Sequence, residues 1–212
     1  QSGLYLLIDV VSVILKCKGE VINGQKHVSL ASPLKLAEGR ILISVPFYND
    51  PAFNRSVVLL VEHNRKGSVG LILNQQSSTP VRKVVKDIFI DDPIYCGGPV
   101  MHNNAFAIHN FANSKSATQV APNVYLGYDE IFLSIVEHKA IKELKYKFFV
   151  GYSGWSAGQL EEELESKMWV VGHGSEKLLL DTPADQIWEQ AVKELGEDYH
   201  HWLHFPTHIC DN

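Results

Sequence analysis

The sequence predicts an α+β (mixed α/β) fold, in which a single compact domain holds a mixed, largely antiparallel β-sheet covered by helices. Three observations support this prediction. Short runs rich in β-branched and aromatic residues recur along the chain and are bounded by turn-forming residues. Several runs come in pairs joined by short turns, which suits antiparallel strands. Amphipathic stretches with helix-capping residues lie between the pairs, without strict strand–helix alternation.

The composition is that of an ordinary globular domain. The chain has 212 residues, of which 45% are hydrophobic, and 19 Lys plus Arg against 24 Asp plus Glu give a formal charge of -5. These values exclude a disordered or collagen-like chain and leave room for a hydrophobic core. The acidic excess, without a cluster of Lys and Arg, argues against a protein that coats nucleic acid, so no direct nucleic acid binding is expected.

The two ends of the chain differ from its middle. We expect an N-terminal extension and linker over residues 1–38, a main domain over residues 39–196, and a His-rich tail over residues 197–212. The apolar run at residues 4–15 is shorter than the about 20 residues that span a membrane, and it lacks the flanks of a signal peptide. It therefore predicts an added strand or packed extension and no membrane association. The widely spaced Cys17, Cys96 and Cys210 favour a reducing, cytoplasmic location.

The main domain is expected to begin with strands. Residues 40–45 and 56–63 are apolar, β-branched runs, and residues 64–67 form a turn ending in Gly before a third run at residues 68–74. The second and third runs predict an antiparallel hairpin. Because both of its arms are apolar on both faces, the hairpin should lie centrally in a covered sheet.

Helices and further strands are predicted to follow. Thr79 and Pro80 have the pattern of a helix start, and the apolar residues after them recur at helical spacing: Val81, Val84, Val85, Ile88 and Phe89. Residues 94–96, 105–109 and 124–127 predict short strands. Asp129 is expected to cap a helix through about residue 139, before a buried strand at residues 146–152.

The last part of the domain repeats these signals. Ser156 and Gln159 form an S-x-x-Q capping box before a helix that carries Leu160 and Leu164 on one face and several glutamates on the other. Residues 168–173 and 177–180 predict a final pair of strands. Thr182 and Pro183 then begin a helix that ends at Gly196.

One pattern suggests a catalytic serine and another suggests a zinc site, and each has a simpler structural explanation. Residues 151–155 (GYSGW) resemble the G-x-S-x-G turn that exposes a nucleophilic serine, but Trp155 replaces the last glycine. We therefore expect a strand-to-helix turn rather than a catalytic Ser153. The C-terminal histidines and Cys210 could bind zinc, but Pro206 breaks any helix and no H-E-x-x-H is present, so we expect an exposed tail and no metal: His200, His201, His204 and His208.

Two more segments are predicted to be structural. The turn at residues 96–99 (CGGP) is not a phosphate-binding loop, and the chain has neither G-x-x-x-x-G-K-[ST] nor G-x-G-x-x-G, so no cofactor is expected. The basic run is interrupted by Glu137 and Glu143, which suggests a solvated helix end rather than a phosphate track: Lys139, Lys142, Lys145 and Lys147.

Several stretches in order resemble one bacterial family, YqgE/AlgH. They are residues 39–74 with D-P-x-F-x-R-S-V-V, residues 96–100 (CGGPV), the Ile108–His109 pair, and residues 147–164 with G-Y-x-G-W-x-x-G-Q-L-E, followed by Trp169. The resemblance implies a compact cytosolic α/β protein with a mixed sheet and no established biochemical activity. It also implies a proposed role in transcriptional regulation, although the sequence has no helix-turn-helix pair and no basic stripe.

The resemblance also selects candidate ligand-binding residues, which are the positions that match the family motifs: Asp50, Arg55, Ser56, His63, Asn74, Gly97, Gly98, Pro99, His109, Trp155, Gln159 and Glu161. We expect a non-enzymatic binding or regulatory protein that contacts an unknown protein partner or small ligand near the Gly97–Gly98 and Trp155 turns, with an indirect effect on transcription. The alternative is a small-molecule hydrolase or other enzyme that uses His63 or His109 with Arg55. If these side chains surround one concave pocket, the alternative gains support.

Overall fold

The structure, a computed structural model, describes residues 34–48, 50–86 and 88–206. The expectations for the run at residues 4–15, for Cys17, and for His208 and Cys210 therefore lie outside the described residues. In the described part, ten strands form a sheet: β1 (Arg40–Ser44), β2 (Val57–Asn64), β3 (Gly67–Ile72), β4 (Gln76–Pro80), β5 (Pro93–Cys96), β6 (Val100–His109), β7 (Thr118–Ala121), β8 (Val124–Leu126), β9 (Tyr146–Ser156) and β10 (Trp169–His173).

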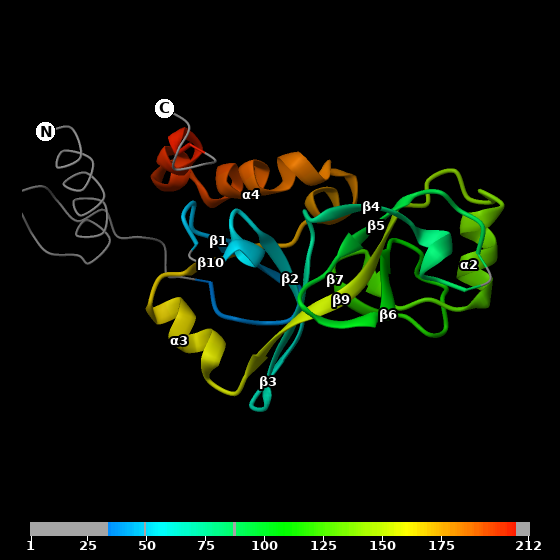
Figure 1. The fold of residues 1–212 in the computed structure, drawn as a ribbon, viewed down its shortest axis with the longest axis horizontal. Helices are drawn as coiled ribbons and strands as arrows, with labels where there is room; N and C mark the ends of the chain where they lie inside the picture. The colour runs from blue at the N-terminus through cyan, green and yellow to red at the C-terminus, as the bar shows by residue number, and fades with distance from the viewer. Residues whose placement is uncertain (1–33, 49, 87, 207–212) are drawn as a thin grey trace, which may run out of the picture. The chain divides into compact units, whose positions relative to one another are not determined.

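The sheet is largely antiparallel, and the fold is α+β as predicted. The main strand order is β10-β1-β2-β3-β9-β6-β8-β7, and β5 joins at the side, where it pairs with β4 and with β9. The β5–β9 pairing is parallel, whereas the others are antiparallel. The long strand β9 runs through both halves of the sheet (Figure 1), because it pairs with β3 at one end and with β6 at the other.

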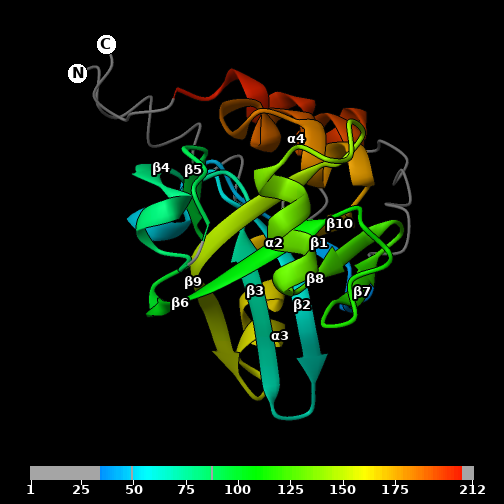
Figure 2. The ribbon, with the colours of Figure 1, turned by 90° about the vertical axis from the view of Figure 1, so that its right-hand side faces the viewer.

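The helices cover the sheet in three places. They are α2 (Glu130–Glu137), α3 (Gln159–Glu165) and α4 (Ile187–Leu195), with short 3-10 or π turns η1 (Pro51–Phe53), η2 (Val81–Lys83), η3 (Lys177–Asp181), η4 (Ala184–Gln186) and η5 (Glu197–His204). In Figures 1 and 2, α4 and η5 lie above the sheet, and the β2–β3 hairpin points away from them.

Alternation along β1 shows how the two faces are filled. Ile41 and Ile43 pack in a core cluster with residues of α4, while Leu42 between them packs with Trp155 and Leu160 on the α3 side. This follows from the period of two in a strand, which sends successive side chains to opposite faces. A third cluster lies between α2 and the β6–β9 half of the sheet. The predicted hairpin is confirmed in the middle of the strand order, with Asn64 opposite Gly67.

The helix predicted to begin at Thr79 is wrong. Val84 and Val85 donate to the carbonyl of Val81, so only the single turn η2 forms. The backbone N–H groups of Val81 and Arg82 donate to the carbonyls of Asp92 and Ile90 at 2.9 and 3.3 Å, which holds this turn to the segment before β5. β-Branched residues favour this outcome because they restrict side-chain rotamers in a helix. The predicted apolar face is buried at Val81, Val85 and Ile88, but Phe89 is exposed.

The strand predicted at residues 177–180 is also wrong, because Lys177–Asp181 forms the π-helical turn η3. Ser175 holds this turn: its Oγ accepts from the N–H of Leu178 at 3.1 Å, and its carbonyl accepts from Leu179. A short apolar run fits a buried helical turn as well as a strand.

Two predicted helix caps and the predicted tail need correction. Half of the predicted capping box forms, because Gln159 Oε1 accepts from the N–H of Ser156 at 3.1 Å. The other half does not, because Ser156 ends β9 and Gly158 with φ 81° is the residue that precedes α3. Thr182 Oγ1 donates to the carbonyl of Lys177 rather than capping the last helix. Residues 197–204 form η5, in which Trp202 is buried and stacks on Trp188 with ring centroids 6.4 Å apart.

Candidate functional site

A carboxylate held by aromatic side chains fixes α3 against the sheet. Glu163 Oε2 accepts hydrogen bonds from Trp155 Nε1 at 2.9 Å, Trp169 Nε1 at 2.7 Å and Tyr48 O–H at 3.4 Å. Its Oε1 accepts from Gln159 Nε2 at 3.0 Å. Four donors from α3, β9, β10 and the β1–β2 loop therefore converge on one side chain. We call this set the Glu163 cluster: Tyr48, Phe53, Trp155, Gln159, Glu163 and Trp169.

The rings of the cluster pack closely around the carboxylate. Trp169 lies 5.0 Å from Tyr48, 5.5 Å from Phe53 and 6.2 Å from Trp155 between ring centroids, and most of these pairs are edge-to-face or tilted. Such pairs stabilise a packed core beyond the area that they bury. Burial, followed by the negative charge of Glu163, raises the pKa of Tyr48 to about 12. Tyr48 therefore stays protonated and donates to Glu163 at neutral pH.

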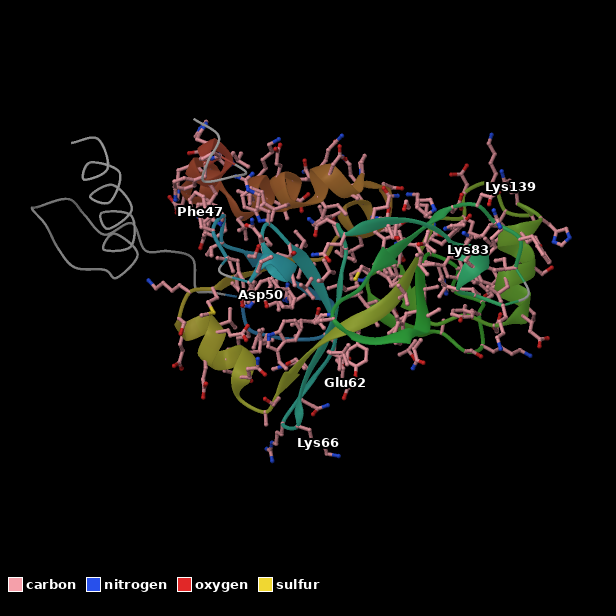
Figure 3. All side chains as sticks on the ribbon, in the orientation of Figure 1. Phe47, Asp50, Glu62, Lys66, Lys83 and Lys139 are labelled. Atoms are coloured by element: carbon pink, nitrogen blue, oxygen red, sulfur yellow. The ribbon has the colours of Figure 1, made fainter. Side chains whose placement is uncertain are left out.

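The opposite side of α3 is acidic and exposed. Glu161, Glu162 and Glu165 point to solvent on α3, and we call these three residues the α3 surface. Beside it, His63 Nε2 lies 4.0 Å from Glu161 Oε1, while His63 Nδ1 shares a 2.8 Å hydrogen bond with Ser68 Oγ. Figure 3 shows Glu62 on the β2–β3 hairpin and Lys66 at its tip.

Arg55 belongs to a different part of the molecule. Its Nη2 donates to the carbonyls of Phe205 and Pro206, the latter at 3.1 Å, and its guanidinium lies 4.7 Å from the ring centroid of Trp188. Burial lowers the pKa of Arg55, and its Nε has no hydrogen-bond partner among the described residues. The β1–β2 loop thus has two neighbours. The ring of Phe47, which Figure 3 labels, lies 5.1 Å from the ring of Phe205 between centroids, whereas Tyr48 belongs to the Glu163 cluster.

Asp50, Ser56 and Asn74 make hydrogen bonds that hold the loop carrying Arg55. Asn74 Oδ1 accepts from the N–H of Val57 at 3.0 Å, and its Nδ2 donates to the carbonyl of Arg55 at 2.8 Å. The backbone N–H of the buried Ser56 donates to Ser44 Oγ at 2.8 Å. Asp50 caps η1 by accepting from the N–H of Ala52 at 2.9 Å. These bonds hold the loop before β2, where Arg55 has φ 48°.

The Gly97–Gly98 turn packs directly on β9. Gly98 has φ 149°, and a Cβ there would lie 2.3 Å from Ser153 Oγ. Ser153 is fully buried, and its Oγ donates to the carbonyl of Gly97 at 3.2 Å. The residues of the G-x-S-x-G-like segment therefore form a packed strand in which the hydroxyl is not presented to solvent. Pro99 follows the turn and is exposed.

His109 is buried by itself in the α2 half of the sheet. Its Nε2 bonds to the carbonyl of Gly127 at 2.8 Å, its Nδ1 accepts from the N–H of Phe111 at 3.2 Å, and its ring stacks on Phe132 at 4.2 Å. Burial lowers the pKa of His109, although the Gly127 bond and the charge of Asp129 raise it in part. Both ring nitrogens are thus used in holding the fold.

This lowered pKa predicts a loss of stability in acid. The unfolded state, with a His pKa of about 6.5, binds more protons than the folded state, so the free energy of unfolding falls as the pH drops below about 6.5. His109→Gln should remove this contribution. In urea titrations at about pH 7.5 and about pH 5.5, the stability difference between the wild type and H109Q should shrink on acidification. A difference that stays constant or grows would contradict the structural role of neutral His109.

The structure therefore divides the twelve candidate residues. Four come together around α3: His63, Trp155, Gln159 and Glu161. A second group lies before β2 (Asp50, Arg55 and Ser56) and just after β3 (Asn74). In the third group Gly97 and Gly98 pack against β9 and the exposed Pro99 follows them, and His109 is separate. Arg55, His63 and His109 share no hydrogen-bond partner.

Sequence reasoning missed the residue at the centre of the cluster. Glu163 stands four residues after Gln159 in a run of glutamates that reads as a solvated face. Leu160 and Leu164 on either side of it face the sheet, so Glu163 faces the sheet in part. A carboxylate on the inner edge of an amphipathic helix, with two tryptophans nearby in sequence, is the signal that could have identified it.

The described part of the chain contains neither a cluster of metal ligands nor a membrane-spanning helix. No three His, Cys, Asp or Glu side chains among residues 34–48, 50–86 and 88–206 come together as a metal site would require. Within the same residues, no helix has the length and apolar character needed to cross a bilayer.

Comparison with known sequences gives a consistent picture. The family profile described as AlgH-like matches residues 41–200. A UPF0301 protein of Bacteroides thetaiotaomicron is 37% identical over 174 residues, which cover 80% of this chain and 88% of that protein. A UPF0301 protein of Chlorobaculum tepidum is 34% identical over 167 residues, with coverage of 77% and 89%.

Solved structures show the same fold. The solution structure of the AlgH protein from Pseudomonas aeruginosa matches with a TM-score of 0.63 at 26% identity, covering 88% of this chain and 100% of that one. The crystal structure of a protein from Corynebacterium diphtheriae matches with a TM-score of 0.69 at 21% identity, covering 82% and 95%. The second likeness concerns the fold alone.

Proposed function

The chain belongs to the AlgH-like family, and from this premise we propose that it is a non-enzymatic binding protein of the bacterial cytoplasm that acts on a protein partner through the α3 surface. The observation that carries this proposal is the attachment of α3 by Glu163. Bonds from Trp155 and Trp169 fix one side of the helix, so the glutamates on its other side are presented in a fixed arrangement. A pre-ordered surface binds at a lower entropic cost than a mobile one.

The negative charge of the α3 surface indicates what kind of partner it would bind. Three exposed carboxylates on a seven-residue helix favour a basic segment of another protein, rich in Lys and Arg. The same carboxylates repel the phosphates of nucleic acid, as does the net charge of -5. An effect on transcription would then act through the protein partner rather than through contact with DNA.

The arrangement of the titratable candidates supports binding over catalysis. A hydrolytic site needs a nucleophile or base beside a group that stabilises developing charge. Arg55 is engaged with backbone carbonyls near residue 205, His63 with Ser68, and His109 with Gly127. These three side chains belong to separate networks, which leaves the alternative enzyme without a shared pocket.

Site-specific photo-crosslinking in cells tests the proposal. A photo-reactive amino acid replaces Glu162 on α3 or, as the control, the exposed Glu194 on α4. We expect a discrete covalent adduct with another protein from position 162 that position 194 does not form. Because neither site contacts the core, both variants should fold. The absence of an adduct at position 162, or the same adducts from both positions, would refute a partner surface on α3.

A further inference from the structure

A recess lies at the side of the sheet, away from the α3 surface. The recess has a volume of about 240 Å³. Its walls come from β4, β5, the first residues of β9 and residues 180–183, which precede α4. In Figure 1 the segment before α4 lies beside β4. The volume of the recess is below the about 300–1,000 Å³ of sites for drug-sized ligands, so it fits a small molecule. The polar lining residues are Gln76, Asp92, Tyr95, Tyr146, Lys147, Asp181 and Thr182.

Lys147 places a buried amine at this recess. Its side chain is 6% exposed, although the sequence suggested a solvated basic run. Among the described residues, Nζ makes one hydrogen bond, to the carbonyl of Thr182 at a long 3.3 Å, and Nζ lies 5.5 Å from the ring centroid of Tyr95. Since an ammonium has three N–H donors, most of its hydrogen-bonding capacity is unused, and both neighbours line the recess.

The environment favours the neutral amine. Burial lowers the pKa of Lys147 to about 8, although the charge of Asp181 raises it in part. At pH 7 an amine of pKa about 8 is unprotonated in about one molecule in ten, against fewer than about one in a thousand for an ordinary lysine. An unprotonated primary amine is a nucleophile toward carbonyl carbon.

The other charged groups of the recess are already paired. Asp181 accepts from Lys145 Nζ at 2.7 Å, Lys145 Nζ also lies 3.5 Å from Glu176, and Asp92 accepts from Tyr146 O–H at 2.5 Å. The walls thus carry two carboxylates and no further free cation among the described lining residues. When Lys147 is the neutral amine that reacts, these carboxylates exceed the cations at the recess, so an anionic ligand would be repelled there, whereas an uncharged ligand would not.

We propose that Lys147 binds small uncharged aldehydes or ketones in this recess as a reversible imine. The lone pair of Nζ adds to the carbonyl carbon, and one of the two Nζ protons moves to the carbonyl oxygen to give a neutral carbinolamine. The hydroxyl then takes up a proton and leaves as water, a carbon–nitrogen double bond forms, and the second Nζ proton is released, which replaces the proton that left with the water. One water is released for each imine, and no oxidant or reductant takes part. The recess and the α3 surface share no residue, so either can fail without the other.

Reductive trapping on the full chain tests this inference. The protein is treated with propanal and cyanoborohydride at about pH 7, and modified lysines are quantified by peptide mass mapping. We expect Lys147 to be alkylated at least about tenfold faster than the exposed Lys139 and Lys142. Labelling of Lys147 no faster than these two lysines would overturn the proposal.

Three comparisons make the result specific. Lys147→Met should remove the fast alkylation. Gln76→Trp, at an exposed residue of the recess, should slow the alkylation of Lys147, because the indole obstructs entry while the amine is kept.

The charge of the ligand is tested with a second reagent. Glyoxylate, an aldehyde with a carboxylate, should react more slowly at Lys147 than propanal does. Equal rates in wild type and Q76W would contradict entry through the recess, and faster reaction with glyoxylate would contradict an uncharged ligand.

Discussion

Glu163→Ala should lower the free energy of unfolding by about 3 kcal/mol, because hydrogen bonds to a charged group contribute about 1.5–3 kcal/mol each and two buried indole N–H groups would lose their acceptor. Trp155 and Trp169 are 6% and 2% exposed, so water does not readily replace the carboxylate. Urea denaturation followed by tryptophan fluorescence measures the change, and two of the four tryptophans contact the mutated side chain.

Two variants separate the role of Glu163 from general effects on α3. Glu165→Ala removes an exposed carboxylate of the same helix and should change stability by no more than about 0.5 kcal/mol. Glu163→Gln keeps one acceptor oxygen and should recover part of the loss. If E163A and E165A cost the same, the Glu163 cluster does not hold α3.

Gly98→Ala should cost about 3 kcal/mol or more, because it combines a strained backbone with a clash. Gly98 has φ 149°, which residues with a side chain rarely adopt, and the added Cβ would lie 2.4 Å from the backbone N of Ser153. Strand β9 cannot move away without disturbing its pairing with β3 and β6. The measurement is the urea midpoint of the variant against that of the wild type.

Gly158→Ala is the matched control for Gly98. Gly158 also has a positive φ of 81°, but a Cβ there meets nothing within 4 Å. Only the conformational cost of about 1–2 kcal/mol should remain. If the two alanine variants are equally stable, contact between the Gly97–Gly98 turn and β9 is not what requires glycine at position 98.

The sequence predicted most of the sheet but not the elements that depend on distant pairing. The runs that became β1, β2, β3, β9 and β10 are strongly apolar and β-branched, so local pattern sufficed. Strand β4 is polar (QSSTP) and exists because β5 lies beside it, with Gln76 opposite Tyr95. Strand β7 (TQVA) is only four residues long and has two apolar residues, so it gives little local signal, although its partner β8 follows after two residues.

The functional candidates show the same limit. The motifs located the α3 region through Trp155, Gln159 and Glu161, but the burial of Glu163 and Lys147 depends on side chains from other strands and turns. Glu163 lies among exposed glutamates, and Lys147 ends a basic run, so both have the local pattern of solvated residues. Only the tertiary structure shows that one is held by tryptophans and the other lines a recess.

The most direct test of the α3 surface combines photo-crosslinking with charge reversal. The quantity measured is the yield of the protein adduct formed by the photo-reactive amino acid at position 162, with and without reversal of the neighbouring glutamate charges. Glu161→Lys with Glu165→Lys should reduce the yield at least about tenfold, because like charges across an interface cost more than about 1.4 kcal/mol. The control reverses Glu189 and Glu197 of α4 and η5 and should leave the yield unchanged. An undiminished adduct in the α3 variant, with both proteins folded, would contradict a partner bound by the acidic face of α3.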